Sequence, residues 1–135
     1  MLEFTEAVKK GEGEYLPPKR ILIVDDEAPI RQLLVDYLGS LGYETAEACN
    51  GLDAVQQVKT FDPGLIILDL VMPEQEGIET IHEIRLTNKS LKIIAVSGAF
   101  AGQFLRTAEL LGANAVLPKP LNLSELARLA KELLG

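Results

Sequence analysis

The chain has 135 residues, 47% of them hydrophobic, and a formal net charge of -7. This length and composition predict one globular domain with a substantial core and exclude a disordered chain. The acidic balance argues against direct binding to nucleic acid, whose backbone attracts clustered Lys and Arg.

The protein is expected to be cytoplasmic and to stay off the membrane. No apolar run approaches the roughly 20 residues that span a bilayer, and the N-terminus carries acids where a signal peptide is basic. Cys49 and His82 are the only residues of their types, so neither an internal disulfide nor a Cys/His zinc site is expected. We expect Cys49 to be a small buried hydrophobic residue, and His82 to be a surface or boundary residue rather than a phosphohistidine.

Residues 1–18 are expected to form an N-terminal extension or linker, and residues 19–135 the folded domain. The extension contains Gly11, Gly13 and the pair Pro17 and Pro18, which cannot continue a helix. Residues 2–10 are long enough for one or two helical turns, which are marginal in water without something to pack on.

From residue 19 onward, short apolar runs alternate with segments whose apolar residues recur at helical spacing. The expected strands cover residues 21–24, 43–49, 65–69, 92–96 and 115–117. The expected helices cover residues 28–41, 52–61, 78–87 and 101–111, and a last helix is capped by Asn122 or Ser124. Strand and helix alternate throughout, which predicts an α/β fold with a five-stranded parallel sheet, doubly wound, and helices on both faces.

The most apolar strand closes on an acid. Residues 65–68 are all aliphatic, as in a strand that is buried on both faces of a parallel sheet. Because an ionised carboxylate is costly to bury, Asp69 is expected at the carboxyl end of this strand, where open α/β sheets leave a crevice for ligands. Pro73 then prevents the strand from continuing, and residues 74–77 make a polar turn. Taken alone, Asp69 is equally compatible with a helix cap in an ordinary loop.

Polar side chains follow four of the five predicted strands: Asp25 and Asp26, Asp69, Ser97, and Lys119. The carboxyl ends of parallel strands share one edge of the sheet, so these groups are expected to meet there. Three neighbouring carboxylates repel one another and call for a cation, and a set of oxygen ligands favours Mg²⁺ or Mn²⁺ over Zn²⁺. A divalent cation, an ammonium group and a hydroxyl beside a carboxylate are what phosphoryl transfer to that carboxylate requires.

These residues together resemble the receiver domain of two-component response regulators, over essentially the whole chain from residue 19 to residue 135. The matching positions are residues 21–27, Gly42, Tyr43, Glu44, residues 48–51, residues 69–73, Gly77, Ser97, residues 111–113, Lys119 and Pro120. The resemblance implies a flavodoxin-like sheet of strand order 2-1-3-4-5. It fits a stand-alone, chemotaxis-type receiver and equally a receiver excised from a larger regulator or hybrid kinase.

The resemblance also implies a metal site. Asp26, Asp69 and the backbone carbonyl of Val71 would bind Mg²⁺ directly, Mn²⁺ being an alternative, and Asp25 would act through water. Asp69 would be the phosphoacceptor, taking its phosphoryl group from a histidine kinase or a phosphotransfer protein and losing it by hydrolysis. The chain would thus catalyse its own phosphorylation and dephosphorylation without turning over an external substrate.

Two further roles follow from the same resemblance. Lys119 would pair with the acceptor Asp69 and then with the phosphoryl group, and Ser97 would donate a hydrogen bond to it. The peptide bond between Lys119 and Pro120 would be cis. The face formed by helix 101–111, strand 115–117 and the last helix would switch conformation and bind a downstream protein or a second copy of the chain.

One position departs from the family pattern. Receivers commonly carry Tyr or Phe three residues before the Lys, whereas this chain carries Val116. A β-branched side chain has few χ1 choices, so a signal must travel through the loop after Ser97 and a shift of the following helix.

Other functions are weighed against this interpretation. A receiver-like scaffold or dimerisation module that is never phosphorylated stays open, because Val116 weakens the usual switch. An aspartate-nucleophile phosphatase is disfavoured because it needs an acid two residues after the nucleophile, where this chain has Val71. A nucleotide-binding protein is disfavoured because no Gly-rich loop follows the first strand, and Asp25 and Asp26 would repel a pyrophosphate.

Overall fold

The computed structural model describes residues 8–10, 14–72, 76–98 and 101–135. Of the polar turn predicted for residues 74–77, residues 74 and 75 lie outside this part, and residues 76 and 77 are already helical. The main elements of the structure alternate as the sequence predicts. They are β3 (Arg20–Val24), α1 (Ala28–Ser40), β4 (Glu44–Ala48), α2 (Gly51–Phe61), β5 (Leu65–Asp69), α3 (Glu76–Thr87), β6 (Lys92–Ser97), α4 (Ala101–Leu111), β7 (Ala115–Pro118) and α5 (Leu123–Leu134).

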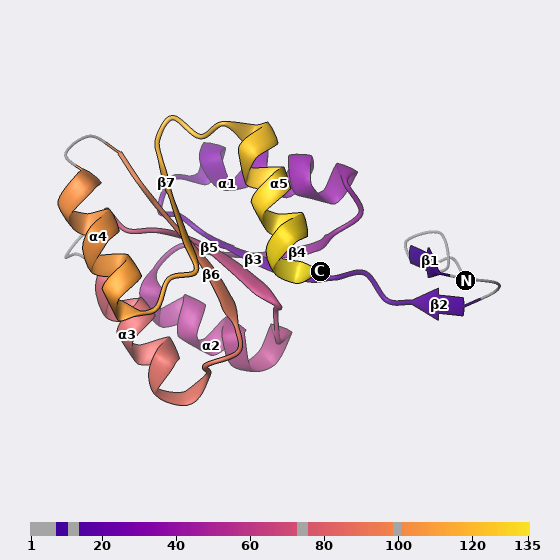
Figure 1. Ribbon diagram of the computed structural model, residues 1–135, viewed down its shortest axis with the longest axis horizontal. Coiled ribbons are helices and arrows are strands. Elements are labelled where there is room, and N and C mark those ends of the chain that lie inside the picture. Colours follow the sequence, from indigo (N-terminus) through magenta and orange to yellow (C-terminus); the bar gives the residue numbers. More distant parts are fainter. Residues whose placement is uncertain (1–7, 11–13, 73–75, 99–100) are drawn as a thin grey trace.

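These strands form a five-stranded sheet in the order β4-β3-β5-β6-β7, with every pair parallel (Figure 1). Counting only the strands of this sheet, the order is 2-1-3-4-5, which confirms the expected flavodoxin-like fold. The register sets Val24 opposite Leu68 and Asp69 opposite Val96, so β3, β5 and β6 end at nearly the same level. Asp25, Asp69 and Ser97 therefore reach one edge of the sheet.

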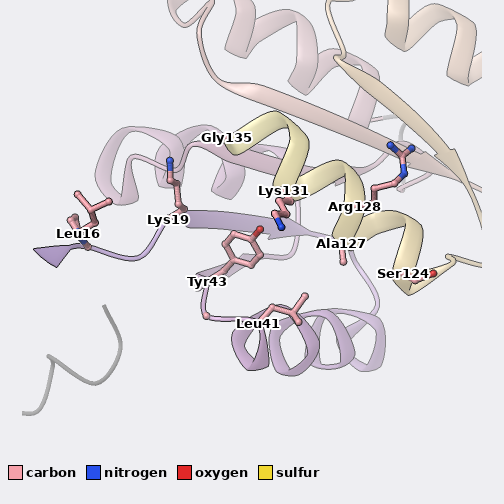
Figure 2. A pocket seen from close by; sticks show the side chains of 11 residues that line it. Leu16, Lys19, Leu41, Tyr43, Ser124, Ala127, Arg128, Lys131 and Gly135 are labelled. Carbon is pink, nitrogen blue, oxygen red and sulfur yellow. The ribbon is translucent and has the colours of Figure 1, made fainter. Parts of the chain in front are cut away.

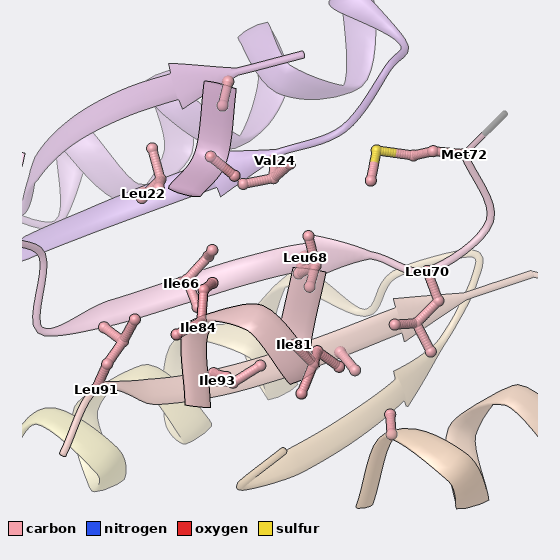
Figure 3. Close-up of a cluster of buried hydrophobic side chains, with 14 residues drawn as sticks. Leu22, Val24, Ile66, Leu68, Leu70, Met72, Ile81, Ile84, Leu91 and Ile93 are labelled. Atoms are coloured by element: carbon pink, nitrogen blue, oxygen red, sulfur yellow. The ribbon is translucent and has the colours of Figure 1, made fainter. Parts of the chain in front are cut away.

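Alternate residues of each strand pack on opposite faces of the sheet. Leu22, Ile66 and Ile93 belong to a cluster that α2, α3 and α4 cover (Figure 3). Their neighbours Ile21 and Ile94 belong to a second cluster, which α1 and α5 close on the other face (Figure 1). Each large aliphatic side chain that is fully buried contributes roughly 1.5–3 kcal/mol, so this double core fixes the sheet on which the polar edge is built.

Two helices start at side-chain caps. The Asn50 side chain accepts a hydrogen bond from the Asp53 N–H at the start of α2, and the Asn122 side chain accepts one from the Glu125 N–H at the start of α5. Of the two caps proposed for the last helix, Asn122 is therefore the one used. The Ser124 hydroxyl instead donates to the Asn122 side chain, over 2.8 Å.

Residues 8–10 do not form the marginal helical turn for which the segment 2–10 is long enough. Val8–Lys10 is a strand, β1, which pairs antiparallel with β2 (Glu14–Leu16) in a separate two-stranded sheet. Pairing satisfies backbone groups that a single helical turn leaves unbonded, which explains why the strand is preferred.

The chain after β2 runs beside the end of α5 (Figure 2). Lys19 Nζ donates to the Leu134 carbonyl over 3.0 Å, joining the start of β3 to the end of α5. A hollow of about 760 Å³ lies there, with Leu16, Leu41, Tyr43 and Lys131 among its lining residues. This end of the sheet is opposite to the polar edge.

Cys49 is exposed, so the expectation that it is buried is wrong. The buried residue at this point is Ala48, the last residue of β4, after which the chain leaves the sheet. His82 is exposed, as expected. Within the described part of the chain, no helix is long and apolar enough to cross a membrane.

Candidate functional site

Asp69 is the last residue of β5 and is 3% exposed. Its Oδ1 accepts a hydrogen bond from the Val71 N–H over 3.0 Å, and the next residue, Leu70, donates its N–H to the Val96 carbonyl over 2.8 Å. The carboxylate thus sits at the strand's carboxyl end, as predicted, bonded to the loop that follows. Asp69 is therefore not the cap of α3, because it bonds the Val71 N–H and the helix begins only at Glu76.

Two more acids follow β3. Asp25 is 3% exposed, and its Oδ1 accepts a hydrogen bond from the Glu27 N–H over 2.8 Å. Asp26 is exposed. Asp25, Asp26 and Asp69 each offer a carboxylate oxygen, and these oxygens lie within 4.8 Å of one another. The predicted meeting of three carboxylates at one edge of the sheet is thereby confirmed.

Lys119 bridges two of these acids. Its Nζ lies 3.3 Å from Asp25 Oδ2 and 3.3 Å from Asp69 Oδ2. The peptide bond between Lys119 and Pro120 is cis, as expected. The Lys119 N–H donates to the Ser97 carbonyl over 2.7 Å, which fixes the backbone of this residue beside the end of β6. One ammonium group therefore offsets only part of the negative charge of three carboxylates.

Ser97 is the last residue of β6 and is fully buried. Among the side chains that the structure describes, its Oγ is the one buried polar atom without a hydrogen-bond partner. Such an atom costs roughly 1–3 kcal/mol unless something binds it. The register places Ser97 opposite Pro118, directly before Lys119, so Ser97 lies at the same end of the sheet as the acidic group.

The electrostatics of the site follow from burial and these contacts. Burial raises the pKa of Asp69, the Val71 N–H lowers it, the Asp25 charge raises it and Lys119 lowers it, with a net increase above the ordinary value. Burial lowers the pKa of Lys119, but the Asp69 and Asp25 carboxylates more than compensate and raise it overall. Lys119 therefore stays cationic at neutral pH, and the site favours additional positive charge.

The site opens to solvent through a hollow of about 240 Å³ lined by Asp26, Glu27, Asp69, Val71, Gly98 and Lys119. Oxygen ligands of one Mg²⁺ ion, at about 2.1 Å from it, lie roughly 3 to 4.2 Å apart. The Asp26 and Asp69 oxygens, within 4.8 Å of each other, need to close only slightly to fit that spacing, and Asp25 is near enough to act through water. A hard, all-oxygen donor set with surplus negative charge thus fits Mg²⁺ or Mn²⁺.

Arg31 was missed from the sequence alone as a residue that supports the site, and Gly77 was named without a structural reason. Arg31 of α1 donates its Nη1 to the Asp25 carbonyl over 2.7 Å, although in the sequence it looks like any surface arginine. Gly77 of α3 lies against Asp69 and Leu70, where an added Cβ would come within 2.5 Å of Leu70 Cα. The resemblance marked Gly77 as a matching position but gave no reason for it.

Comparison with known proteins gives a consistent result. The family model of the response regulator receiver domain matches residues 21–131. Over 103 residues the chain is 40% identical to a chemotaxis protein CheY of Thermotoga maritima, covering 76% of this chain and 86% of that protein. Over 116 residues it is 31% identical to sporulation initiation phosphotransferase F of Bacillus subtilis, covering 86% and 94%.

A solved structure agrees with these sequences. The CheY-like response regulator receiver domain protein of Methanospirillum hungatei superposes with a TM-score of 0.80 at 29% identity, covering 85% of this chain and 92% of that one. The family match includes Asp25, Asp26, Asp69, Ser97 and Lys119. The chain therefore belongs to the family of response regulator receiver domains, which act in two-component signalling.

Proposed function

We propose that this chain is a phosphorelay receiver that accepts a phosphoryl group on Asp69 in a Mg²⁺-dependent reaction. The observation that carries the proposal is the set of Asp25, Asp26 and Asp69 oxygens within 4.8 Å of one another, with Lys119 beside them. An acidic triad of this kind is typical of the Mg²⁺ site of receivers. Residues 19–135 form the receiver, and residues 1–18 an extension or linker.

In the proposed reaction, an Asp69 carboxylate oxygen attacks the phosphorus of a phosphohistidine. The phosphorus–nitrogen bond breaks, and the histidine keeps the electron pair. Lys119 turns its ammonium group from the Asp69 carboxylate to the phosphoryl oxygens, while its bond to Asp25 keeps it in place. Ser97 Oγ, which is unpartnered, donates to a phosphoryl oxygen. Water later attacks the phosphorus and releases phosphate, which restores the carboxylate.

Asp26, Asp69 and the Val71 carbonyl would hold Mg²⁺ or Mn²⁺ directly, with Asp25 acting through water. When bound, the ion supplies positive charge that offsets the negative phosphoryl oxygens. Exposure of Asp26 leaves room for ligand exchange on the solvent side, whereas Asp69 is held by the Val71 N–H. The same bond keeps the backbone of Val71 close to the acceptor.

The output face is proposed to be α4, β7 and α5. β7 is an edge strand, and none of its residues is fully buried. Val116 of β7 is half-buried and packs against the cluster under α2, α3 and α4. A phosphoryl group that draws the Ser97 hydroxyl toward Asp69 would pull on the loop after β6 and shift α4, without an aromatic rotamer change.

The partners follow from the family. Receivers generally take their phosphoryl group from a histidine kinase, so we propose such a kinase or a phosphotransfer protein as the donor. A downstream protein or a second copy of the chain would bind the output face. The net charge of -7 argues against direct contact with nucleic acid, and we place the protein in the cytoplasm, off the membrane.

Intact-mass measurement tests the reaction. The protein is incubated with a small-molecule phosphodonor, with and without Mg²⁺, as wild type, Asp69→Asn and Asp62→Asn. Asp62 is an exposed acid in the left-handed region, a conformation that Asn accepts readily, so Asp62→Asn controls for loss of a carboxylate alone. We expect one Mg²⁺-dependent phosphoryl group on wild type and Asp62→Asn, and none on Asp69→Asn.

A folded wild type that binds Mg²⁺ and gains no mass would contradict the proposal. The chain would then be a scaffold or dimerisation module with a receiver fold. Phosphorylation that survives in Asp69→Asn would instead place the acceptor elsewhere.

A further inference from the structure

Arg31 joins three parts of the fold next to the acidic site. It lies in the second turn of α1, and its side chain is only 17% exposed. Its Nε donates to Glu47 Oε1 of β4 over 3.0 Å, and its Nη1 donates to the Asp25 carbonyl over 2.7 Å. The second bond is the shorter one and goes to the loop that carries two of the three acids.

That carbonyl belongs to the peptide unit between Asp25 and Asp26. A planar peptide unit carries both neighbouring Cα atoms with it, so a bond to its oxygen restrains where both side chains leave the backbone. The exposed Asp26 carboxylate needs such restraint, because no hydrogen bond or ion pair holds it within the described part of the chain. Asp25 is also held from within the loop, by its bond to the Glu27 N–H.

We propose that Arg31 is a positioning residue of the acidic site, which fixes the peptide between Asp25 and Asp26 so that both carboxylates face the cation that Asp69 helps to bind. Because this inference rests on the proposed Mg²⁺ site, Arg31 is expected to strengthen Mg²⁺ binding without touching the ion. Residues one shell beyond metal ligands commonly affect affinity by about 10-fold or more.

Electrostatics alone predicts the opposite sign. Arg31 is a cation beside a cluster of three carboxylates, so its removal leaves the cluster more negative and should tighten Mg²⁺ binding. Positioning predicts weaker binding when Arg31 is removed. The direction of the change in Kd therefore distinguishes the two roles of the same side chain.

The test compares Arg31→Met, Arg31→Lys and Glu47→Gln with wild type. Glu47→Gln removes the ion pair but leaves the bond from Arg31 to the Asp25 carbonyl, so it is the matched control. Arg31→Lys keeps the charge but lacks the planar fork that bonds Glu47 and Asp25 at once. Mg²⁺ titrations by calorimetry give Kd, and amide hydrogen exchange at Glu27 in the metal-free protein reports on the loop.

We expect Arg31→Met to raise the Kd for Mg²⁺ by about 10-fold, Arg31→Lys by less, and Glu47→Gln by no more than about 2-fold. Exchange at Glu27 should quicken in Arg31→Met and stay unchanged in Glu47→Gln. An equal or tighter Kd in folded Arg31→Met overturns the inference. If wild type itself does not bind Mg²⁺, the proposed metal site fails, and unchanged Glu27 exchange in Arg31→Met then overturns the positioning role separately.

Discussion

Replacing Gly77 by Ala should destabilise the protein and disturb the acceptor site, although the position is helical. An added Cβ at Gly77 would lie 2.5 Å from Leu70 Cα, 2.6 Å from the Asp69 carbonyl oxygen and 2.9 Å from the Leu70 carbonyl oxygen. These neighbours are backbone atoms, and ordinary contact begins at 3.4 Å, so the backbone beside Asp69 must move by several tenths of an ångström. Forcing extra atoms into a packed site costs roughly 1–3 kcal/mol.

Gly39→Ala is the matched control. Gly39 also lies in a helix, α1, and a Cβ there meets nothing within 4 Å. Helix propensity alone favours Ala over Gly by about 1 kcal/mol at both positions. We therefore expect Gly39→Ala to raise Tm by a few degrees. For Gly77→Ala, the packing cost less the propensity gain leaves a net loss of up to about 2 kcal/mol, which lowers Tm by up to about 8 °C; circular dichroism measures both. Mg²⁺ affinity should fall only in Gly77→Ala. Equal stability of the two variants would refute this reasoning.

Three more outcomes follow from the contacts. Asn122→Ala removes the cap of α5 and should lower the free energy of unfolding in urea by about 1 kcal/mol, whereas Ser124→Ala should lower it clearly less. Equal losses in the two variants would show that Asn122 is not the main cap. Cys49 is exposed, so a thiol reagent should modify the native protein without prior unfolding, and a rate limited by unfolding would contradict its exposure. Burial raises the pKa of Asp69, so its ionised form destabilises the metal-free fold, and the stability that this acid contributes is lost as pH rises through the raised pKa. Without metal, Asp69→Asn should then become more stable than wild type as pH rises. Saturating Mg²⁺ should reverse that order. An Asp69→Asn variant that is less stable than wild type at every pH without metal would contradict this prediction.

The fold could be predicted because its central strand consists of aliphatic residues without polar alternation. Residues 65–68 are aliphatic on both faces, and in the structure all four are buried between two layers of helices. Parallel strands then determine the site, since the residue after each apolar run must reach the same edge. For that reason, the sequence alone was enough to predict that Asp69 and Ser97 lie at this edge.

The cap of the last helix, the exposure of Cys49 and the role of Arg31 could not be predicted, because they depend on the local path of the backbone rather than on residue type. Asn122 and Ser124 are both good caps, and only the backbone decides that Asn122 bonds the Glu125 N–H. Cys49 follows the buried Ala48, but the chain leaves the sheet between them, so the burial of one says nothing of the other. Arg31 is one of few polar residues in the first half of α1, and its bond to the Asp25 carbonyl has no sequence signal at all.

The unpaired hydroxyl of Ser97 offers a source of free energy for a switch without an aromatic ring. In the unphosphorylated protein this buried Oγ has no partner, which costs roughly 1–3 kcal/mol. A phosphoryl group on Asp69 would give this hydroxyl an acceptor if the end of β6 moves toward Asp69. Recovering 1–3 kcal/mol shifts a two-state equilibrium by about 5- to 150-fold. Because Lys119 bonds the Ser97 carbonyl through its N–H, the same movement would pass directly to the end of β7, so Val116 need not change rotamer for the output face to respond.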